Sequence, residues 1–333
     1  MIHVISEKLR KSLLSLEKRH LTIREERMVC VLKIQDRILC SARNFLSREG
    51  FLQIQAPVMG PATDPGLRGA KQAIIDFYGK PMRLMGSMLL HKQMAMSALG
   101  KIFAFSPCVR FESEETKETG RHLVEFYQLD LEAKGYDYDK IMDLGERLVV
   151  RVIKYVKKHC KEELEFLGRK IKIPKLPFKK MTHEEAIGIC RELGFDVSHG
   201  EEIPWEAEKA LSEHIGEFFW VKDYPTGSRG FYDRIDPKDK RKLRDFDLFY
   251  PEGYGEAISG SERETELSKV KMKMKEASVE TRGYEWYFEM LKYGIPESAG
   301  FGIGIERLTR FICGLDFVWE AAPFPKVAGV VSP

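Results

Sequence analysis

One segment pairs charged residues in a way that suits binding of a phosphate. In VRFESEETKETGRHLVEFYQLDLE (109–132), Arg110 and Glu112 lie two residues apart on an expected strand, so they face the same side. The loop that follows carries Arg121 and His122, and a second strand returns. Such a hairpin presents a fixed arginine to a phosphate, with a second cation at its tip. A charged ribbon that faces water is an equally good interpretation of this segment alone.

A second segment, SAGFGIGIERLTRFICGL, has glycine at alternate positions. Gly300, Gly302 and Gly304 leave one face of a strand bare, so a flat ring or a phosphate can approach the backbone, and Arg307 opens the helix that follows. The spacing is not the G-x-G-x-x-G of dinucleotide sites, because Ile305 stands in the expected turn. Close packing of strand against helix is the alternative reason for these glycines.

Two further segments carry charges near expected strand or helix ends. In DFDLFYPEGYGEAISGSERE, the pair Asp247 and Glu256 suits Mg²⁺, which prefers one or two carboxylates together with oxygens of the substrate. A solvated turn is the alternative for this pair. In GSMLLHKQ, Ser87, His91 and Lys92 lie at the start of an expected helix. Taken alone, such lysine and histidine side chains are usually on the surface.

The elements around these segments predict an α+β fold. Short strands alternate with helices without regular strand–helix–strand repeats, which favours an antiparallel sheet. Thr182 and Glu185 form a capping-box sequence that begins a helix ending at Gly194. The other main expected elements are helices at 27–50, 87–99, 136–166, 266–277, 285–294 and 306–315, a strand at 51–58, a hairpin at 74–85, two strands within 101–113 and a strand at 125–135.

Composition narrows the class of protein. The chain has 333 residues, of which 43% are hydrophobic and 32% charged, and a net charge of +3, which by itself gives no reason to expect nucleic-acid binding. No apolar run approaches the roughly 20 residues that span a bilayer, so no membrane is expected. The six cysteines are scattered. This scatter suggests neither a zinc ribbon nor a disulfide framework, and it favours a cytoplasmic protein with reduced thiols.

In chain order, the segments resemble the three motifs of class II aminoacyl-tRNA synthetases. The order is a strand closed by Pro57, the S-M-L-L-H-K segment, the R-x-E hairpin, the acidic pair and G-x-G-x-G-x-E-R. GEAISGSERE, the HEEAIGICRELG…FFWVKDYP segment and the R-x-E…GRH…EF hairpin are similar to the aspartyl/asparaginyl subgroup, from about Ile34 to the C-terminus. The resemblance implies an antiparallel sheet flanked by helices, and a homodimer interface built by the strand that ends at Pro57.

The resemblance also implies an ATP site. Arg110 would contact the α-phosphate, Glu112 the adenine amino group, Arg121 or His122 the γ-phosphate, and Phe126 would stack on adenine. A substrate carboxylate would attack the α-phosphate, and fixed guanidinium groups would stabilise the charge that develops there. The residues expected to bind ATP are Arg110, Glu112, Arg121, His122, Phe126, Gly304 and Arg307, with Arg110 and Arg307 catalytic and with Asp247 and Glu256 holding Mg²⁺.

The amino-acid site follows from the same resemblance. Lys92 matches a lysine that aspartyl enzymes use on the side-chain carboxylate, so aspartate is expected over asparagine. Leu89 stands where the family has a substrate-binding glutamine, which changes the expected pose. The full expected set is Ser87, Lys92, Gln128, Asp130 and Arg263.

Length leads to the expected reaction. Residues 1–30 are expected to form a helical extension and residues 31–333 the catalytic domain, which leaves no room for the anticodon-binding barrel of roughly 100 residues. In this the chain resembles archaeal asparagine synthetase-related proteins. We therefore expect aspartate to be adenylated and amidated by ammonia to asparagine, with release of AMP and pyrophosphate, and tRNA to be an unlikely partner.

Two alternatives remain open at this point. One is a truncated synthetase-like ligase that transfers its amino acid to an RNA, a protein or a metabolite. The other is a non-catalytic regulatory paralogue, which the presence of Arg110, Glu112, Glu256 and Arg307 disfavours.

Overall fold

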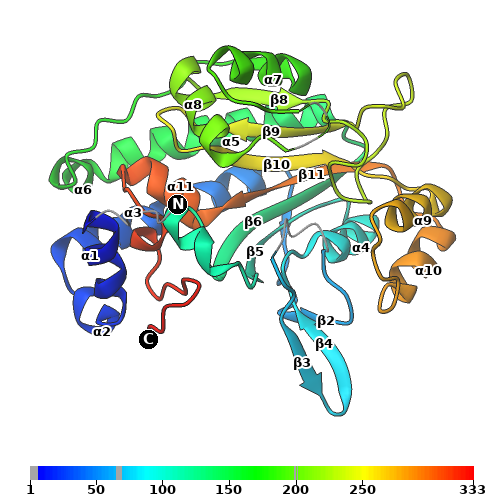
Figure 1. Ribbon diagram of the computed structural model, residues 1–333, viewed down its shortest axis with the longest axis horizontal. Helices are drawn as coiled ribbons and strands as arrows, with labels where there is room; N and C mark the ends of the chain where they lie inside the picture. The colour runs from blue at the N-terminus through cyan, green and yellow to red at the C-terminus, as the bar shows by residue number, and fades with distance from the viewer. Residues whose placement is uncertain (1–6, 65–69, 199, 201) are drawn as a thin grey trace.

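The computed structural model describes residues 7–64, 70–198, 200 and 202–333 (Figure 1). Its α-helices are α1 (Glu7–Leu16), α2 (Arg19–Thr22), α3 (Glu26–Arg48), α4 (Leu89–Leu99), α5 (Tyr138–His159), α6 (Lys161–Phe166), α7 (His183–Glu192), α8 (Trp205–Ile215), α9 (Leu267–Glu276), α10 (Glu285–Tyr293) and α11 (Ile305–Cys313). Two 3₁₀ helices are η1 (Glu114–Thr119) and η2 (Val318–Ala321). The strands are β1 (Leu52–Gln53), β2 (Met59–Gly60), β3 (Ile74–Phe77), β4 (Lys80–Leu84), β5 (Lys101–Val109), β6 (Glu125–Lys134), β7 (Lys179–Thr182), β8 (Phe219–Lys222), β9 (Asp245–Phe249), β10 (Glu256–Glu262) and β11 (Ser298–Gly304).

A mixed sheet forms the centre of the molecule. Within the described residues its eight strands lie in the order β1-β5-β6-β11-β10-β9-β8-β7, and a small sheet, β2-β4-β3, extends away from it (Figure 1). All central pairs are antiparallel, while the two edge pairs, β1–β5 and β7–β8, are parallel. The expected α+β fold with an antiparallel sheet flanked by helices is therefore confirmed, and its edges are parallel.

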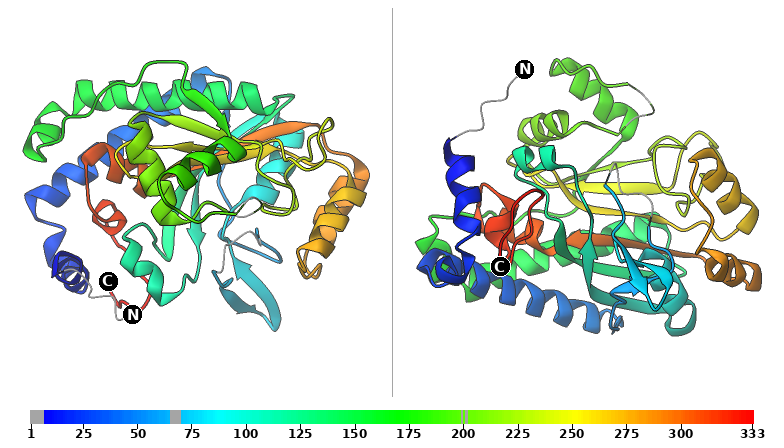
Figure 2. Two further views of the ribbon diagram at one scale, coloured as in Figure 1. Left: turned by 45° about the horizontal axis from the view of Figure 1, so that its top comes forward. Right: turned by 60° about the horizontal axis from the view of Figure 1, so that its bottom comes forward.

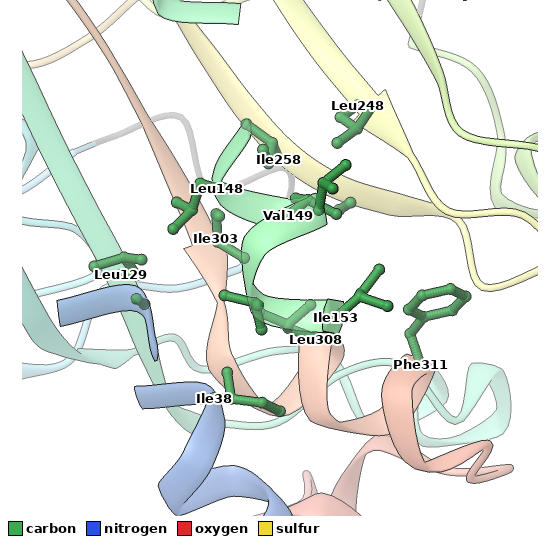
Figure 3. Packing of buried hydrophobic residues seen from close by; sticks show 14 of the residues in the cluster. Ile38, Leu129, Leu148, Val149, Ile153, Leu248, Ile258, Ile303, Leu308 and Phe311 are labelled. Carbon is green, nitrogen blue, oxygen red and sulfur yellow. The ribbon is translucent and has the colours of Figure 1, made fainter. Parts of the chain in front are cut away.

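The alternation of residues along β6 explains how one sheet serves both core and site. Leu129, Leu131 and Ala133 are buried in the main hydrophobic cluster, while Gln128 and Asp130 point to the other face. Behind the sheet, the cluster is filled by side chains from α3, α5 and α11; Figure 3 shows Ile38, Leu148, Val149, Ile153, Leu308 and Phe311 among them. This rigid layer holds the polar face of β6 in place.

A second, smaller core supports α7 and α8. These helices pack on β7, β8 and β9 through a cluster that includes Ile187, Leu211 and Phe219. The expected capping box is confirmed: Thr182 Oγ1 accepts from the Glu185 backbone N–H at 3.2 Å, and the Glu185 carboxylate accepts from the Thr182 N–H at 2.7 Å. The two cores place α8 at one end of the sheet, next to the site described below.

Three local expectations are wrong. The helix expected at 136–166 is two helices, because the backbone of Cys160 leaves the helical region between α5 and α6. The two strands expected within 101–113 are the single strand β5. Pro107 has no backbone N–H to donate. It is tolerated in β5 because β1 pairs only with Ile102 and Phe103, so no strand beside Pro107 on that side needs this donor. The strand expected at 51–58 is reduced to β1.

Helix α1 and the C-terminal segment pack against each other. A cluster that includes Leu9, Leu16, Trp319 and Val327 joins α1 to the C-terminal segment. The expected division at residue 30 falls inside α3, which runs unbroken from Glu26 to Arg48; the two-part organisation stays a prediction. In the described parts of the chain, no helix has the length and apolarity needed to cross a membrane.

Candidate active site

A cavity of about 430 Å³ opens on the polar face of the sheet. It is lined by the β5–β6 hairpin, by β10 and β11, by the start of α4 and by the loop before β9. Of the residues expected to form a site, the cavity brings together Ser87, Lys92, Arg110, Glu112, Arg121, His122, Phe126, Gln128, Asp130, Glu256, Arg263, Gly304 and Arg307. Asp247 is the exception. The individual roles of these residues stay predictions.

One end of the cavity is rich in arginine. The Arg110 guanidinium lies 5.1 Å from the centre of the Phe126 ring, and its Nε donates to the Gly86 carbonyl at 3.1 Å. Arg307, on the first turn of α11, pairs with Glu256 at 3.2 Å. Burial raises the pKa of Glu112, and the nearby Arg110 and Arg307 partly offset this. Fixed cations with a neighbouring flat ring suit a nucleotide.

Two residues that no sequence pattern singles out hold the Arg121 side chain in place. Its Nη1 donates to Glu208 at 2.8 Å, and both side chains are buried. The guanidinium also lies 4.3 Å from the centre of the Trp205 ring. Glu208 and Trp205 are on α8, more than 80 residues away in sequence. No motif links them to the hairpin, and only the packing of α8 brings them together.

His122 does not supply a second positive charge. Burial, with the nearby Arg307 and Arg121, lowers its pKa to about 3, so its ring is neutral near pH 7. Its Nδ1 lies 3.0 Å from Thr119 Oγ1, within hydrogen-bonding distance. Of the two candidates for the cation at the hairpin tip, the structure favours Arg121.

The expected Mg²⁺ pair is not assembled. Asp247 is buried against Tyr224, whose hydroxyl donates to it at 2.9 Å, and it is ion-paired with Arg229. Glu256 lines the cavity beside Arg307, but Asp247 does not line it. Among the described residues, no cluster of three or more His, Cys, Asp or Glu side chains could hold a metal ion. The arrangement does not fit a two-carboxylate metal site, and Mg²⁺ binding stays a prediction.

The other end of the cavity holds a compact cluster of paired charges. Lys92 Nζ donates to Asp130 Oδ1 at 3.0 Å and to the Phe301 carbonyl at 3.2 Å, and lies 3.9 Å from Glu132. Arg263 binds both oxygens of Glu132 at 3.1–3.3 Å. All four charged side chains are buried. Lys92 is therefore already neutralised, and it gives no ground for preferring a substrate carboxylate.

Further acidic residues line this end that sequence reasoning missed. They are Asp64, Glu202, Asp233 and Asp245. Burial raises the pKa of Asp233, and it raises that of Asp245 well above its usual value. For Asp233 and Asp245 the only sequence signal is a concentration of charge between 229 and 247, which is equally typical of a solvated loop. Asp64 and Glu202 lie in other parts of the sequence, without such a signal.

Comparison with known proteins adds a family to this geometry. The family described as tRNA synthetases class II (D, K and N) matches residues 11–328. The asparagine–tRNA ligase of Desulforamulus reducens is 32% identical over 321 residues, which cover 96% of this chain and 74% of the ligase. That of Pyrococcus abyssi is 32% identical over 323 residues, covering 96% and 73%. The crystal structure of asparaginyl-tRNA synthetase from Pyrococcus horikoshii, complexed with asparaginyl-adenylate, matches with a TM-score of 0.90 and 31% identity, over 99% of this chain and 76% of that one.

These relatives overturn two expectations. Amidation of aspartate by ammonia is wrong as the main interpretation, because the similar proteins over nearly the whole chain are asparagine–tRNA ligases. The expectation that tRNA is an unlikely partner is wrong for the same reason. The alternative of a synthetase-like ligase fits better. The resemblance to a class II core of the aspartyl/asparaginyl subgroup is confirmed, as is the ligase class with nucleotide binding. This chain belongs to the class II tRNA synthetases of the D, K and N group.

Proposed function

We propose that this protein activates asparagine with ATP and transfers it to tRNA. The observation that carries the proposal is the division of the cavity. Arg110, Arg121 and Arg307 lie at one end and outnumber their two ion-pair partners, Glu208 and Glu256. A buried cluster in which each cation has its own carboxylate, Lys92–Asp130 and Arg263–Glu132, lies at the other end. A phosphate chain fits the first end, and a small polar amino acid fits the second. The asparaginyl-adenylate in the Pyrococcus horikoshii synthetase likewise joins an amino acid to the phosphate of a nucleotide.

The first step joins the two ends. A carboxylate oxygen of the amino acid attacks the α-phosphorus, and the bond to pyrophosphate breaks with its electron pair on the leaving oxygen. Negative charge on the phosphate oxygens grows in the transition state, so arginines held in place beforehand stabilise it more than the bound ATP. The stack on Phe126 and the hydrogen bond to Gly86 hold Arg110 for this task. In the second step a tRNA hydroxyl attacks the acyl carbon and AMP leaves.

Charge balance favours asparagine over aspartate. Lys92 and Arg263 are matched by Asp130 and Glu132, and Asp233 adds another carboxyl nearby at 3.6 Å from Arg263. The α-ammonium of a substrate suits such acidic surroundings. A second carboxylate placed there would be desolvated without a cation of its own, which is costly. A neutral amide side chain avoids that cost.

Exchange of labelled pyrophosphate into ATP tests the first step. We expect exchange with asparagine and at least about tenfold less with aspartate, because one buried unpaired charge costs more than 1.4 kcal/mol. Exchange that depends on aspartate alone would contradict the proposed specificity. Exchange with asparagine without charging of tRNA would contradict the proposed acceptor.

We further propose that the protein is a cytoplasmic homodimer. Hydrophobic side chains are exposed near Pro57 and on the small sheet: Leu52, Val58, Met59, Ile74, Phe77 and Tyr78. Such a group is typical of a surface that a second copy covers. The six cysteines form no disulfide, which suits a reducing compartment. Light scattering that gave a monomer mass at micromolar concentration would contradict the dimer.

A further inference from the structure

Positive charge is concentrated in one segment of the chain. Residues 151–180 contain eleven lysines and arginines against three glutamates, a net charge of +8, whereas the whole chain carries only +3. The rest of the protein is therefore net acidic. The near-neutral overall composition conceals a strongly basic region.

The structure folds this segment back on itself. After α6, the chain returns alongside α5 in the opposite direction, as the left view of Figure 2 shows. Three contacts fix the path: Lys157 Nζ donates to the Ile171 carbonyl at 2.6 Å, the Phe178 N–H donates to Glu146 at 3.1 Å, and Lys180 pairs with Asp139 at 3.4 Å. The returning segment therefore runs beside α5 from Asp139 to Lys157, a length of about 27 Å at 1.5 Å per residue.

The two antiparallel segments present two rows of cations. On α5, Val152, Ile153 and Val156 are buried in the core, so the opposite side of the helix faces water. We call the exposed cations of both rows the basic face: Arg151, Lys154 and Lys158 from α5, and Lys170, Lys172 and Lys175 from the returning segment. None of the six forms an ion pair within 4.0 Å with another described residue.

We propose that the basic face docks the phosphate backbone of double-helical RNA; this rests on the proposed function in that the acceptor is an RNA. The α5 row, from Arg151 to Lys158, is about 10 Å long at 1.5 Å per residue, and the second row lies on the segment beside it. Six cations gathered in this way match several neighbouring phosphates of a polyanion whose charges repeat regularly along its axis. Five of the six are lysines, which act as flexible point charges and position a backbone without reading bases. A membrane is a poorer fit, because the exposed apolar residues nearby, Phe166, Ile173 and Leu176, are few beside the charges.

The basic face and the cavity lie on opposite sides of the sheet. Helix α5 packs on the core side, where Gly145 approaches Ile258, Trp220 and Phe301, while the cavity lies on the polar side. RNA on the basic face therefore leaves the nucleotide and amino-acid sites open. Charge changes on this face are expected to leave adenylate formation unchanged.

A charge-reversal variant of the full chain tests the proposal. In K154E/K158E/K172E/K175E, we expect the affinity for a fluorescent RNA duplex of about 20 base pairs to fall at least about tenfold, since each phosphate contact adds about one to the salt slope. The magnitude of the slope of log K against log salt should decrease by about 3.6, because each of the four lysines accounts for about 0.9. The matched control K238E/K240E/K275E/K292E makes the same change of charge at exposed lysines elsewhere. It should bind RNA within about twofold of wild type, since surface charges away from the contact act only through screened fields.

Other outcomes would overturn the proposal. They are an absence of duplex binding by the wild type, equal loss in both variants, or loss of binding to phosphatidylserine vesicles in the first variant with RNA binding intact. Circular dichroism melting of both variants identifies any unfolding, and the double variant K154E/K172E repeats the test with less perturbation. Pyrophosphate exchange, measured in parallel, separates the two proposals: RNA binding without exchange contradicts only the proposed function, and exchange without RNA binding contradicts only the basic face.

Discussion

Arg121, at the tip of the β5–β6 hairpin, is tied to Glu208 on α8 by a buried ion pair of 2.8 Å. The pair joins two cores, because the hairpin belongs to the main sheet cluster and α8 to the smaller one. Trp205, on the same helix, covers the guanidinium at 4.3 Å. Helix α8 does not line the cavity itself, but through Glu208 and Trp205 it positions Arg121 at the arginine-rich end.

Replacing Glu208 should impair ATP binding more than chemistry. In Glu208→Gln, Arg121 loses its charged partner, and we expect the KM for ATP to rise about tenfold with kcat changed less, since a broken buried pair costs a few kcal/mol shared between stability and binding. Steady-state exchange kinetics measure both constants. Glu213→Gln, an exposed residue on the same helix, is the control. An unchanged KM for ATP in Glu208→Gln would refute the positioning role.

Removal of either of the two arginines proposed to be catalytic should abolish most adenylate formation. We expect Arg110→Ala and Arg307→Ala each to lower pyrophosphate exchange by about 10²–10³, the usual loss when one fixed donor to a developing charge is removed. The control is Arg241→Ala, whose side chain is 87% exposed. Melting temperatures should remain near wild type for Arg110→Ala. Exchange at wild-type rates in either arginine variant would rule out this mechanism.

Lys92 and Asp130, which form an ion pair in the cavity, should contribute to stability and to asparagine binding only when both are present. Lys92→Met leaves Asp130 buried and unpaired, so we expect a loss of about 3–5 kcal/mol in stability and a larger rise in KM for asparagine than for ATP. Lys92→Met/Asp130→Asn removes both charges and should recover part of the stability. Chemical denaturation and exchange kinetics measure these effects. A double variant no more stable than Lys92→Met would contradict the pairing.

His122 should make the protein less stable in acid. In the folded protein the pKa of His122 is about 3, below the ordinary value of 6.5. The contribution of its neutral ring to the free energy of unfolding is therefore complete above about pH 6.5 and is lost as the pH falls toward 3. Between about pH 6.5 and 4, we expect the free energy of unfolding to fall less in His122→Asn than in wild type. At about pH 4 the two losses should differ by a few kcal/mol. Denaturant titrations at several pH values provide the measurement. Parallel pH profiles for the two proteins would mean that His122 charges freely in the folded state.

The sequence predicted those parts of the site whose residues are close together in the chain. The two strands of the β5–β6 hairpin place Arg110 and Phe126 side by side, and Thr182 begins α7 as its capping sequence indicates. The short range of these interactions makes them readable from spacing. This also holds for the hydrophobic alternation along β6.

Pairings across long stretches of chain could not be predicted. Glu208 meets Arg121 only because a second core docks α8 on the sheet. Asp247 has the sequence position of a metal ligand, yet Arg229 and Tyr224 occupy its oxygens. The sequence around Lys92 is the same whether or not Asp130 neutralises the lysine. The prediction that its charge is available to a substrate carboxylate was therefore wrong. In each case the missing information is the identity of the neighbour in space.

Charging of tRNA is the most direct test of the central claim. The purified chain is incubated with ATP, total tRNA and either labelled asparagine or labelled aspartate. Acid-insoluble label is counted, with Arg307→Ala as the control. The account predicts ATP-dependent incorporation of asparagine by the wild type and about 10²-fold less by the variant. Incorporation of no amino acid, or of aspartate in place of asparagine, would contradict it.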